Sequence, residues 1–414
     1  MNKLIVTDWN GQILTALMTD GKCRSFHLEP REEQSLLGTI CIGKVKNVVK
    51  SINAAFVDLG NGRTGYYSLT ENRGHLFADQ MISENIPESV ETGSLLSFRK
   101  VKQGDEIVVQ IAKDAVKTKD PVLTSNLNFT GKYLVLTLGK MQLGFSNKLK
   151  ESRWKEETRQ WLESVKKDCY GVIVRTNADG ISAEVLEKEL QTLEERLLHV
   201  VKTASCRTCY SVLEAPHPSY IQGLRDSYAG SLEAILTDIP AYFEQMKAYL
   251  EEEQPEDAGK LQLYADPTLP LLKLYSLESA MDSALSKHVW LKSGGYLVIE
   301  PTEALTVIDV NTGKYTGKKS MEEAILKINL EAAAETARQL CLRNLSGIII
   351  VDFIDMSSEE HKKRLLETLD AELKKDPVKT VLVEMTKLGL VEITRKKVRK
   401  PLHEMISSAT CFEH

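Results

Sequence analysis

Residues 306–355 constrain the fold more than any other part of the chain, because two apolar segments there each run into a carboxylate. The first segment reaches Asp309, the second, Ile348–Val351, reaches Asp352, and a long helix is predicted between them. A strand, a crossover helix and a second strand favour a parallel unit, in which both strands end at the same edge of the sheet. Open α/β sheets bind ligands at that edge. The stretch therefore predicts an α/β fold with a site at the strand ends.

The residues at these strand ends predict a metal site. A carboxylate at the end of a buried strand is costly unless it is paired or binds a metal, so Asp309 and Asp352 require a shared explanation. Asn311, two residues after Asp309, lies on the same face of its strand. Such oxygen ligands suit Mg²⁺ or Mn²⁺ better than zinc. Either aspartate alone could instead cap a loop or pair with a lysine, and Asp355 is expected to cap a helix that begins near Ser357.

Length and composition are those of a folded multidomain protein. The chain has 414 residues, 42% of them hydrophobic and 27% charged, which is enough for three or four domains. The N-terminus lacks the apolar core of a secretory signal, and no apolar run approaches a membrane span, so we expect a cytoplasmic protein without a membrane partner. Seven scattered cysteines fit reduced thiols better than disulfides, and the lone C-x-x-C of Cys206 and Cys209 is interpreted as incidental.

Local basic clusters indicate a polyanionic substrate, although the net charge of −5 does not. One cluster follows the first carboxylate strand and the other lies near the C-terminus. Such runs are usually solvated surface, yet the first lies beside the predicted metal, where cations attract phosphate groups. The residues are Lys314, Lys318 and Lys319 in the first cluster and Arg395, Lys396, Lys397, Arg399 and Lys400 in the second.

A second module is predicted between Gly38 and about Ala115, where short alternating segments and turn residues favour a small β-barrel. Phe56 and Tyr66 flank the tight 60–65 connection. If the barrel has oligonucleotide-binding topology, these aromatics lie where unpaired bases stack. Phe56 follows two alanines and could equally belong to the core, which is the commoner fate of a phenylalanine.

Long motifs in this chain resemble the ribonuclease E/G family. They are GKVKNVVKSINAAFVDLG, VIVRT at 172–176, ALTVIDVNTGKYTGKKS, LEAAAETARQLCLRN and GIIIVDFIDM, in the family's order and spacing. The resemblance extends over about residues 1–410, and in length the chain is closest to the shorter, G-type members. It implies a ribonuclease-H-like domain from 1–36 and 219–284, split by an oligonucleotide-binding (OB-type) barrel at 37–125 and a 5′-sensor domain at 126–218. A deoxyribonuclease-I-like catalytic domain at 285–400 and a linker at 401–414 complete the plan.

The resemblance also implies roles for single residues. Asp309 and Asp352 match the positions that hold the catalytic Mg²⁺, and Asn311 matches a position that supports the site. Tyr66 replaces a phenylalanine, which should preserve stacking. Asn147, beside Lys148, stands where the family often has an arginine, so we expect weaker sensing of the RNA 5′ end. The residues that match the RNA-gripping positions are Phe56, Tyr66 and Lys119, and those that match the 5′-monophosphate pocket are Gly131, Val135, Arg175 and Thr176.

The C-terminus departs from the family pattern. Family members continue into a C-P-x-C segment whose thiolates from two subunits share one zinc, whereas the sequence here ends with Cys411 and His414 at C-x-x-H spacing. These two side chains could supply an equivalent pair, since two ligands from each of two subunits complete a tetrahedral site. The alternative is that the motif is simply missing. We expect a homodimer or a higher homo-oligomer, with inter-subunit Zn²⁺ left open.

The predicted function is metal-assisted hydrolysis of single-stranded RNA, which leaves a 5′-phosphate and a 3′-hydroxyl. The residues offer no serine, cysteine or histidine constellation for covalent catalysis. A preference for 5′-monophosphorylated RNA and a role in ribosomal RNA processing or messenger decay follow from the resemblance alone. Two alternatives remain at this stage: a metal nuclease that acts on DNA, and a non-catalytic RNA-binding or ribosome-assembly factor.

Overall fold

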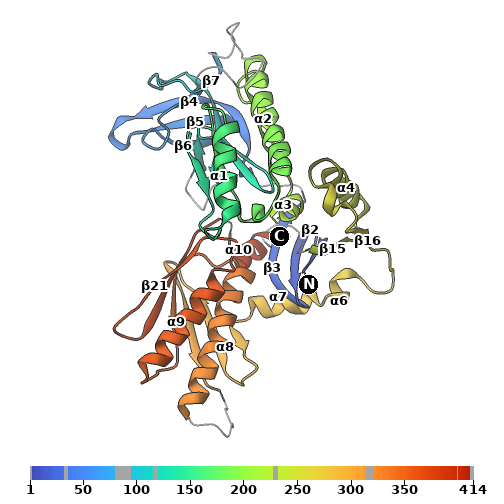
Figure 1. The fold of residues 1–414 in the computed structure, drawn as a ribbon, viewed down its shortest axis with the longest axis vertical. Helices are drawn as coiled ribbons and strands as arrows, with labels where there is room; N and C mark the ends of the chain where they lie inside the picture. Colours follow the sequence, from blue (N-terminus) through green and yellow to red (C-terminus); the bar gives the residue numbers. More distant parts are fainter. Residues whose placement is uncertain are drawn as a thin grey trace. The chain divides into compact units, whose positions relative to one another are not determined.

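The computed structural model describes residues 2–31, 36–79, 95–114, 120–226, 232–313, 321–398 and 400–410. The chain divides into two compact units. The first comprises Met1–Glu33, Ser219–Leu224 and Gly230–His414, and the second comprises Gln34–Pro218 and Arg225–Ala229. Both units mix helices with strands, as the α/β prediction requires (Figure 1). Of the helices in the described ranges, none has the length and apolar character needed to cross a membrane. The four-domain plan and its fold names stay predictions.

A five-stranded sheet begins the first unit. Its first three strands form an antiparallel meander, because the Asn10-Gly11 and Asp20-Gly21 turns adopt the positive φ angles that two-residue hairpins need. Two later strands add in parallel beside the first. The order is β16 (Leu261–Leu263), β15 (Leu232–Thr237), β1 (Asn2–Trp9), β2 (Gln12–Thr19) and β3 (Lys22–Pro30).

Helices cover both faces of this sheet. Buried side chains of β1 alternate between the two faces, so that Leu4 and Val6 join one apolar cluster and Ile5 joins another. The first cluster is completed by α3 (Ser219–Asp226) and α4 (Pro240–Glu253), and the second by α6 (Leu271–Leu274), α7 (Leu277–Leu285) and residues of α8 (Met321–Leu342) and α10 (Leu402–Thr410).

A six-stranded sheet carries the predicted carboxylates. Strands β19 and β20 run parallel and are joined through α8, and their register places Asp309 opposite Asp352, as the sequence predicted. Helices α8 and α9 (Glu359–Leu373) cover one face, where Ile308, Ile349 and Ile393 are buried (Figure 1). The order is β17 (His288–Trp290), β18 (Tyr296–Pro301), β19 (Leu305–Asn311), β20 (Gly347–Asp352), β22 (Leu390–Arg395) and β21 (Thr380–Met385).

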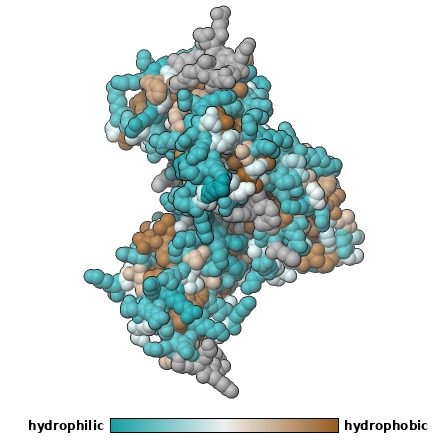
Figure 2. All heavy atoms as spheres, in the orientation of Figure 1, coloured by the Kyte–Doolittle hydropathy of each residue, from teal (hydrophilic) through white to brown (hydrophobic). Residues whose placement is uncertain are grey.

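The other face of this sheet, called the open face below, carries exposed and half-buried side chains. Asp309, Asp352 and Ile348 lie on it, and so do Val381 and Val383 of the edge strand. Figure 2 shows apolar residues gathered on the surface near β21. Strand β19, expected to be buried, is therefore buried on one face only. Its side chains alternate between a packed face and a face that reaches solvent.

Two further expectations for this unit are wrong. The helix after Asp355 is capped by Ser358, whose hydroxyl accepts a hydrogen bond from His361 N at 3.3 Å. Arg395 is not part of a solvated basic surface, because it continues the buried face of β22 and is only 5% exposed. Its guanidinium donates to Asp376 Oδ2 at 2.7 Å and to Asn344 Oδ1 at 2.9 Å.

The second unit contains a closed five-stranded β-barrel, which confirms the predicted OB-like barrel. Pairing between β4 and β8 closes the ring, so that the circular order is β4, β5, β6, β9, β8. The barrel core includes Val45, Ala55, Val57 and Tyr67. The strands are β4 (Ile40–Val49), β5 (Ala54–Gly60), β6 (Arg63–Ser68), β8 (Glu106–Lys113) and β9 (Val122–Thr124), with β7 (Leu76–Phe77) and β14 (Val212–Glu214) attached.

A four-stranded sheet with two helices forms the rest of the second unit. The long α2 (Ala183–Cys206) buries a leucine-rich stripe against the sheet, and α1 (Arg153–Val165) packs into the same core (Figure 1). Ser152 caps the N-terminus of α1, and its hydroxyl accepts a hydrogen bond from Lys155 N. The sheet order is β10 (Asn128–Thr130), β11 (Leu134–Thr137), β13 (Gly171–Val174) and β12 (Leu143–Phe145).

Candidate active site

Asp309 and Asp352 lie side by side on the open face of the six-stranded sheet. They are register partners on adjacent parallel strands, which run about 4.8 Å apart. Both side chains are exposed. Asn311 Nδ2 donates a hydrogen bond of 2.7 Å to Asp309 Oδ2 and so orients that carboxylate. The structure therefore brings together the three residues that the sequence singled out.

The electrostatics of this pair favour a bound cation. Partial burial, and then the negative charges of Asp309 and Asp355, raise the pKa of Asp352 above its usual range. In the ranges that the structure describes, no cluster of three or more His, Cys, Asp or Glu side chains forms a closed metal cage. Mg²⁺ is commonly held by one or two carboxylates, with water and substrate phosphate completing its shell. Two aspartates with an adjacent amide fit that ion.

The predicted basic clusters lie only partly within the described residues. Lys314, Lys318, Lys319 and Arg399 lie outside the described residues. In the C-terminal cluster, Lys396, Lys397 and Lys400 are exposed, whereas Arg395 is buried against Asp376. Three lysines of this cluster can therefore attract phosphate groups, and its first arginine holds the sheet together instead.

Phe56 and Tyr66 face outward from the barrel. They are cross-strand partners on β5 and β6, and their ring centroids lie 6.1 Å apart in an edge-to-face arrangement. Both are half-buried, and neither belongs to the barrel core, which takes Ala55, Val57 and Tyr67 from the alternate positions. Interpreting Phe56 as a core residue is therefore wrong. Lys119, the third predicted RNA contact, lies outside the described residues.

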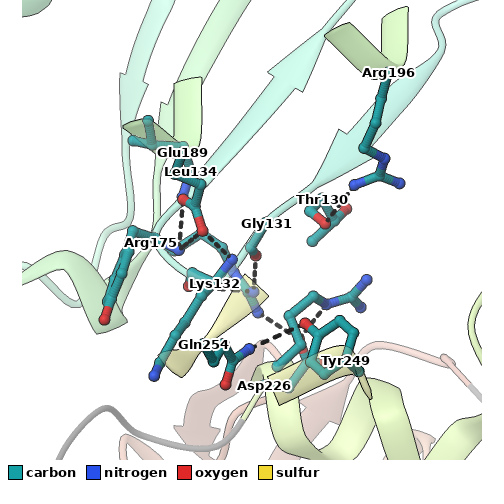
Figure 3. A network of polar contacts seen from close by, with 12 residues as sticks. Thr130, Gly131, Lys132, Leu134, Arg175, Glu189, Arg196, Asp226, Tyr249 and Gln254 are labelled. Atoms are coloured by element: carbon teal, nitrogen blue, oxygen red, sulfur yellow. Dashed lines mark hydrogen bonds and ion pairs between the residues drawn. The ribbon is translucent and has the colours of Figure 1, made fainter. Parts of the chain in front are cut away.

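Arg175 lies at the end of β13, where the sheet extends by a hydrogen bond from Arg175 N to Tyr133 O. Its guanidinium donates to Gly131 O at 2.6 Å and to Asp226 Oδ1 at 2.8 Å (Figure 3). Burial raises the pKa of Asp226, but Arg225 and Arg175 outweigh it and hold that pKa below its usual range. Arg175, the residue predicted to bind the 5′-phosphate, is thus already paired with the Asp226 carboxylate in this structure.

The other predicted pocket residues lie near Arg175. Thr176 follows it directly and opens the short 3₁₀ helix η3 (Thr176–Ala178), with its hydroxyl 2.9 Å from Ser146 Oγ. Asn147 is exposed on the turn after Ser146. Val135 pairs with Ile173 on the neighbouring strands, and both side chains reach the surface.

The turn after Gly131 encloses the carboxylate of Glu189 from α2. Glu189 accepts hydrogen bonds from the backbone N–H groups of Lys132 at 2.6 Å, Tyr133 at 2.9 Å and Leu134 at 2.7 Å (Figure 3). Three successive donors of this kind form an anion-binding concavity. A Cβ atom at Gly131 would lie 2.6 Å from the Glu189 carboxyl carbon, so a larger residue there would push this side chain away from the turn. Burial raises the pKa of Glu189 to about 7, although the three donors oppose this rise.

Comparison with known proteins identifies the family of this chain. The family model of the ribonuclease E/G family matches residues 128–398. A ribonuclease G of Haemophilus influenzae is 35% identical over 393 residues, which are 94% of this chain and 78% of the relative. The chain belongs to the ribonuclease E/G family.

Relatives of both named types occur in the family. Ribonuclease G of Escherichia coli K12 is 30% identical over 98% of this chain and 81% of its own length. Ribonuclease E of a Synechocystis species is 32% identical over 89% of this chain but only 53% of its own length. Family membership makes the chain an endoribonuclease, which confirms the predicted enzyme class.

The sequence interpretation missed two features of this family member. Glu189 is one of many charged residues in its helix, and the neighbouring sequence carries no signal of its contact with the 131–134 turn. Trp290 and Tyr296 lie on the open face beside the carboxylates, with ring centroids 5.1 Å apart. The W-L-K-S-G-G-Y segment could have indicated them, since a tight hairpin places its flanking aromatics opposite each other.

Proposed function

We propose that this protein is a Mg²⁺-dependent endoribonuclease of the cytoplasm that cleaves single-stranded RNA to 5′-phosphate and 3′-hydroxyl ends. The observation that carries the proposal is the alignment of Asp309 with Asp352 on an open sheet face, in a member of the ribonuclease E/G family. A role in ribosomal RNA processing or messenger decay is part of the proposal.

The roles of the three site residues follow from their geometry. Asp309 and Asp352 would hold the divalent ion, for which Mn²⁺ can substitute, and Asn311 fixes the orientation of Asp309 through its 2.7 Å hydrogen bond. A divalent ion held here would supply positive charge to the scissile phosphate and would acidify water. In-line attack of water on the phosphorus then breaks the bond to the 3′ oxygen, which departs as the hydroxyl. Both aspartates are exposed, so an RNA strand can reach them.

Unpaired RNA suits the barrel better than a duplex does. Phe56 and Tyr66 present neighbouring rings on the outer face of β5 and β6. Bases stack on such rings only when they are free of a helix, and the bases of A-form duplexes are not accessible to side chains in that way. Exposed Lys44 and Lys46 on the adjacent β4 add positive charge for the phosphate backbone.

We further propose that the pocket around Arg175 and Thr176 recognises a 5′-monophosphate. A guanidinium and a hydroxyl are suitable donors for a terminal phosphate, and we propose that Val135 and Gly131 complete the pocket. Asp226 competes for the same guanidinium at 2.8 Å. The preference for a 5′-phosphate is therefore weaker than an unpaired arginine would give.

The decisive experiment compares matched RNA and DNA oligonucleotides, with and without Mg²⁺, for the wild type and for Asp309→Asn and Asp352→Asn. Loss of charge stabilisation worth several kcal/mol should lower kcat on the order of a thousandfold in either variant. Glu300→Gln is the matched control, because Glu300 is an exposed acid on the neighbouring strand β18. We expect that control to cut RNA at the wild-type rate.

Three outcomes would contradict the proposal. Equal cleavage of DNA and RNA would favour the DNA nuclease, and RNA binding without Mg²⁺-dependent cleavage would favour a non-catalytic RNA-binding factor. Full activity of Asp309→Asn or Asp352→Asn would remove that residue from the site. Both substitutions relieve like-charge repulsion, so neither should lower the stability of the metal-free protein. Circular dichroism on heating checks this and separates lost catalysis from lost folding.

Assembly into a homodimer or a higher homo-oligomer belongs to the proposal as well. Cys411 and His414, the pair considered for an inter-subunit zinc, lie outside the described residues. Sedimentation with and without a zinc chelator would test the assembly.

A further inference from the structure

Two aromatic side chains form a row that leads to the candidate active site. Strand β17 pairs with β18 so that Trp290 lies directly opposite Tyr296, and β18 pairs with β19 so that Tyr296 lies directly opposite Asn311. All three therefore share the open face with Asp309 and Asp352. Two strand spacings, about 10 Å, separate the backbone of Trp290 from that of Asn311.

The row combines exposure with order. Trp290 is 71% exposed, and its ring lies 5.1 Å from that of Tyr296 at an interplanar angle of 52°. His288, on the same strand as Trp290, also packs on Tyr296, with ring centroids 5.8 Å apart. An indole left in water loses the apolar burial that a tryptophan would gain in a core. Such a side chain, held in place by a neighbouring ring, is suited to a partner that stacks on it.

The hairpin that carries the row is fixed to the strand that carries the carboxylate. Glu331 of α8 accepts hydrogen bonds from Lys292 N at 2.6 Å and Ser293 N at 3.0 Å, which holds the hairpin turn. A Cβ atom at Gly313 would lie 2.2 Å from Gly294 O, so the backbone after β19 packs directly on the same turn. The aromatic rings are thereby placed at a set position relative to Asp309.

We propose that Trp290, supported by Tyr296, stacks on an unpaired base of the RNA strand within a few nucleotides of the scissile phosphate. This inference rests on the proposed function, because the carboxylates define where that phosphate lies. A nucleobase is the fitting partner, since every base has a π-face and the proposed function already brings an RNA phosphodiester to the neighbouring carboxylates. The platform sets the register in which the strand crosses the active site.

The test uses the full-length enzyme and a series of RNA oligonucleotides, each with one abasic nucleotide at a successive position around the mapped cleavage site. Trp290→Ala should raise KM roughly tenfold to a hundredfold, the range for one lost base stack, and Trp290→Phe should restore most of the loss. One abasic position should raise the KM of the wild type by the same factor as the Trp290→Ala substitution does. With that RNA, the KM of Trp290→Ala should not rise further. Ile348→Ala, an apolar truncation on the same sheet face, is the matched control and should keep the wild-type KM.

Binding without cleavage supplies a second readout. In EDTA, intact RNA should quench the tryptophan emission of the wild type, and the quenching should fall in Trp290→Phe and with the critical abasic RNA. Wild-type KM in Trp290→Ala, or equal abasic defects in both proteins, would overturn the inference. So would a change in sedimentation of Trp290→Ala with no base dependence, since a second copy of the chain would then cover the ring. If the wild type fails to cut RNA, the proposed function fails, while the quenching still reports stacking.

Discussion

The carboxylate of Glu189 makes the stability of the second unit depend on pH in a way that a single substitution should reveal. Replacing Glu189 with glutamine keeps the shape of the side chain and removes its charge. The amide oxygen of glutamine can still accept from the turn, but its NH₂ group cannot accept from Lys132, Tyr133 or Leu134 as a carboxylate oxygen does. Glutamine therefore imitates the protonated acid at every pH.

The size of the effect follows from the pKa of Glu189. It rises from its ordinary value of 4.5 to about 7, chiefly because the group is buried. A raised carboxyl pKa gives stability that is fully present below pH 4.5 and is lost as the pH rises through 7. The pKa difference between 4.5 and about 7 corresponds to about 3 kcal/mol in the free energy of unfolding. Because the residue is only half-buried, solvent screens part of this, and we expect a loss of roughly 1 to 3 kcal/mol between pH 5 and pH 8.

Hydrogen exchange of the Lys132, Tyr133 and Leu134 amides is the appropriate assay, because two compact units need not unfold together. Comparison of the variant with the wild type at the same pH cancels the intrinsic pH dependence of exchange. Protection of these amides in the wild type should fall relative to Glu189→Gln between pH 5 and pH 8. His217, in the same unit, adds a pH dependence of opposite sign below about pH 6.5, because burial and then Arg196 and Arg225 lower its pKa to about 4. Both proteins share this contribution, so it cancels when they are compared at the same pH.

A wild-type to variant protection ratio that stays constant across this range would refute the reasoning, because Glu189 would then keep one protonation state. Gly131→Ala provides the control. Its new Cβ atom would lie 2.6 Å from the carboxyl carbon and should displace the side chain from the turn. We expect that variant to lose both the protection and its pH dependence.

Three other predictions concern single side chains. Arg395→Met should lower the free energy of unfolding by roughly 3 to 5 kcal/mol in urea titrations, because it leaves Asp376 buried without its partner, and an unchanged midpoint would contradict the pairing. Phe56→Ala or Tyr66→Ala should raise KM for RNA by the equivalent of roughly 1 to 3 kcal/mol and leave the circular dichroism spectrum unchanged. Global unfolding of Phe56→Ala would instead show that Phe56 acts as a core residue. Asp226→Asn removes the carboxylate that competes with phosphate for Arg175, so it should increase the preference for 5′-monophosphorylated over 5′-hydroxyl RNA. Arg175→Gln should abolish that preference. Equal cleavage rates for both 5′ ends in the wild type and both variants would show that the pocket is not used.

The sequence by itself determined the parts of this protein that depend on local order along the chain. Alternation within a strand places Asn311 on the same face as Asp309. A crossover helix between two parallel strands places the strand ends that carry Asp309 and Asp352 at the same edge of the sheet. Both follow from residues that are near in sequence or joined by one helix. The same holds for the barrel, whose short strands and turns are recognisable one by one.

Only the tertiary structure decided which faces are covered and which distant groups meet. Phe56 points outward and Arg395 inward because the register of their strands sets which alternate positions reach the core. Glu189 reaches a turn more than fifty residues earlier in the chain, and Trp290 gains its place only through the order β17, β18, β19. The physical reason is that a local pattern sets the period of side chains, whereas burial and pairing across strands are properties of contacts between segments that are far apart in sequence.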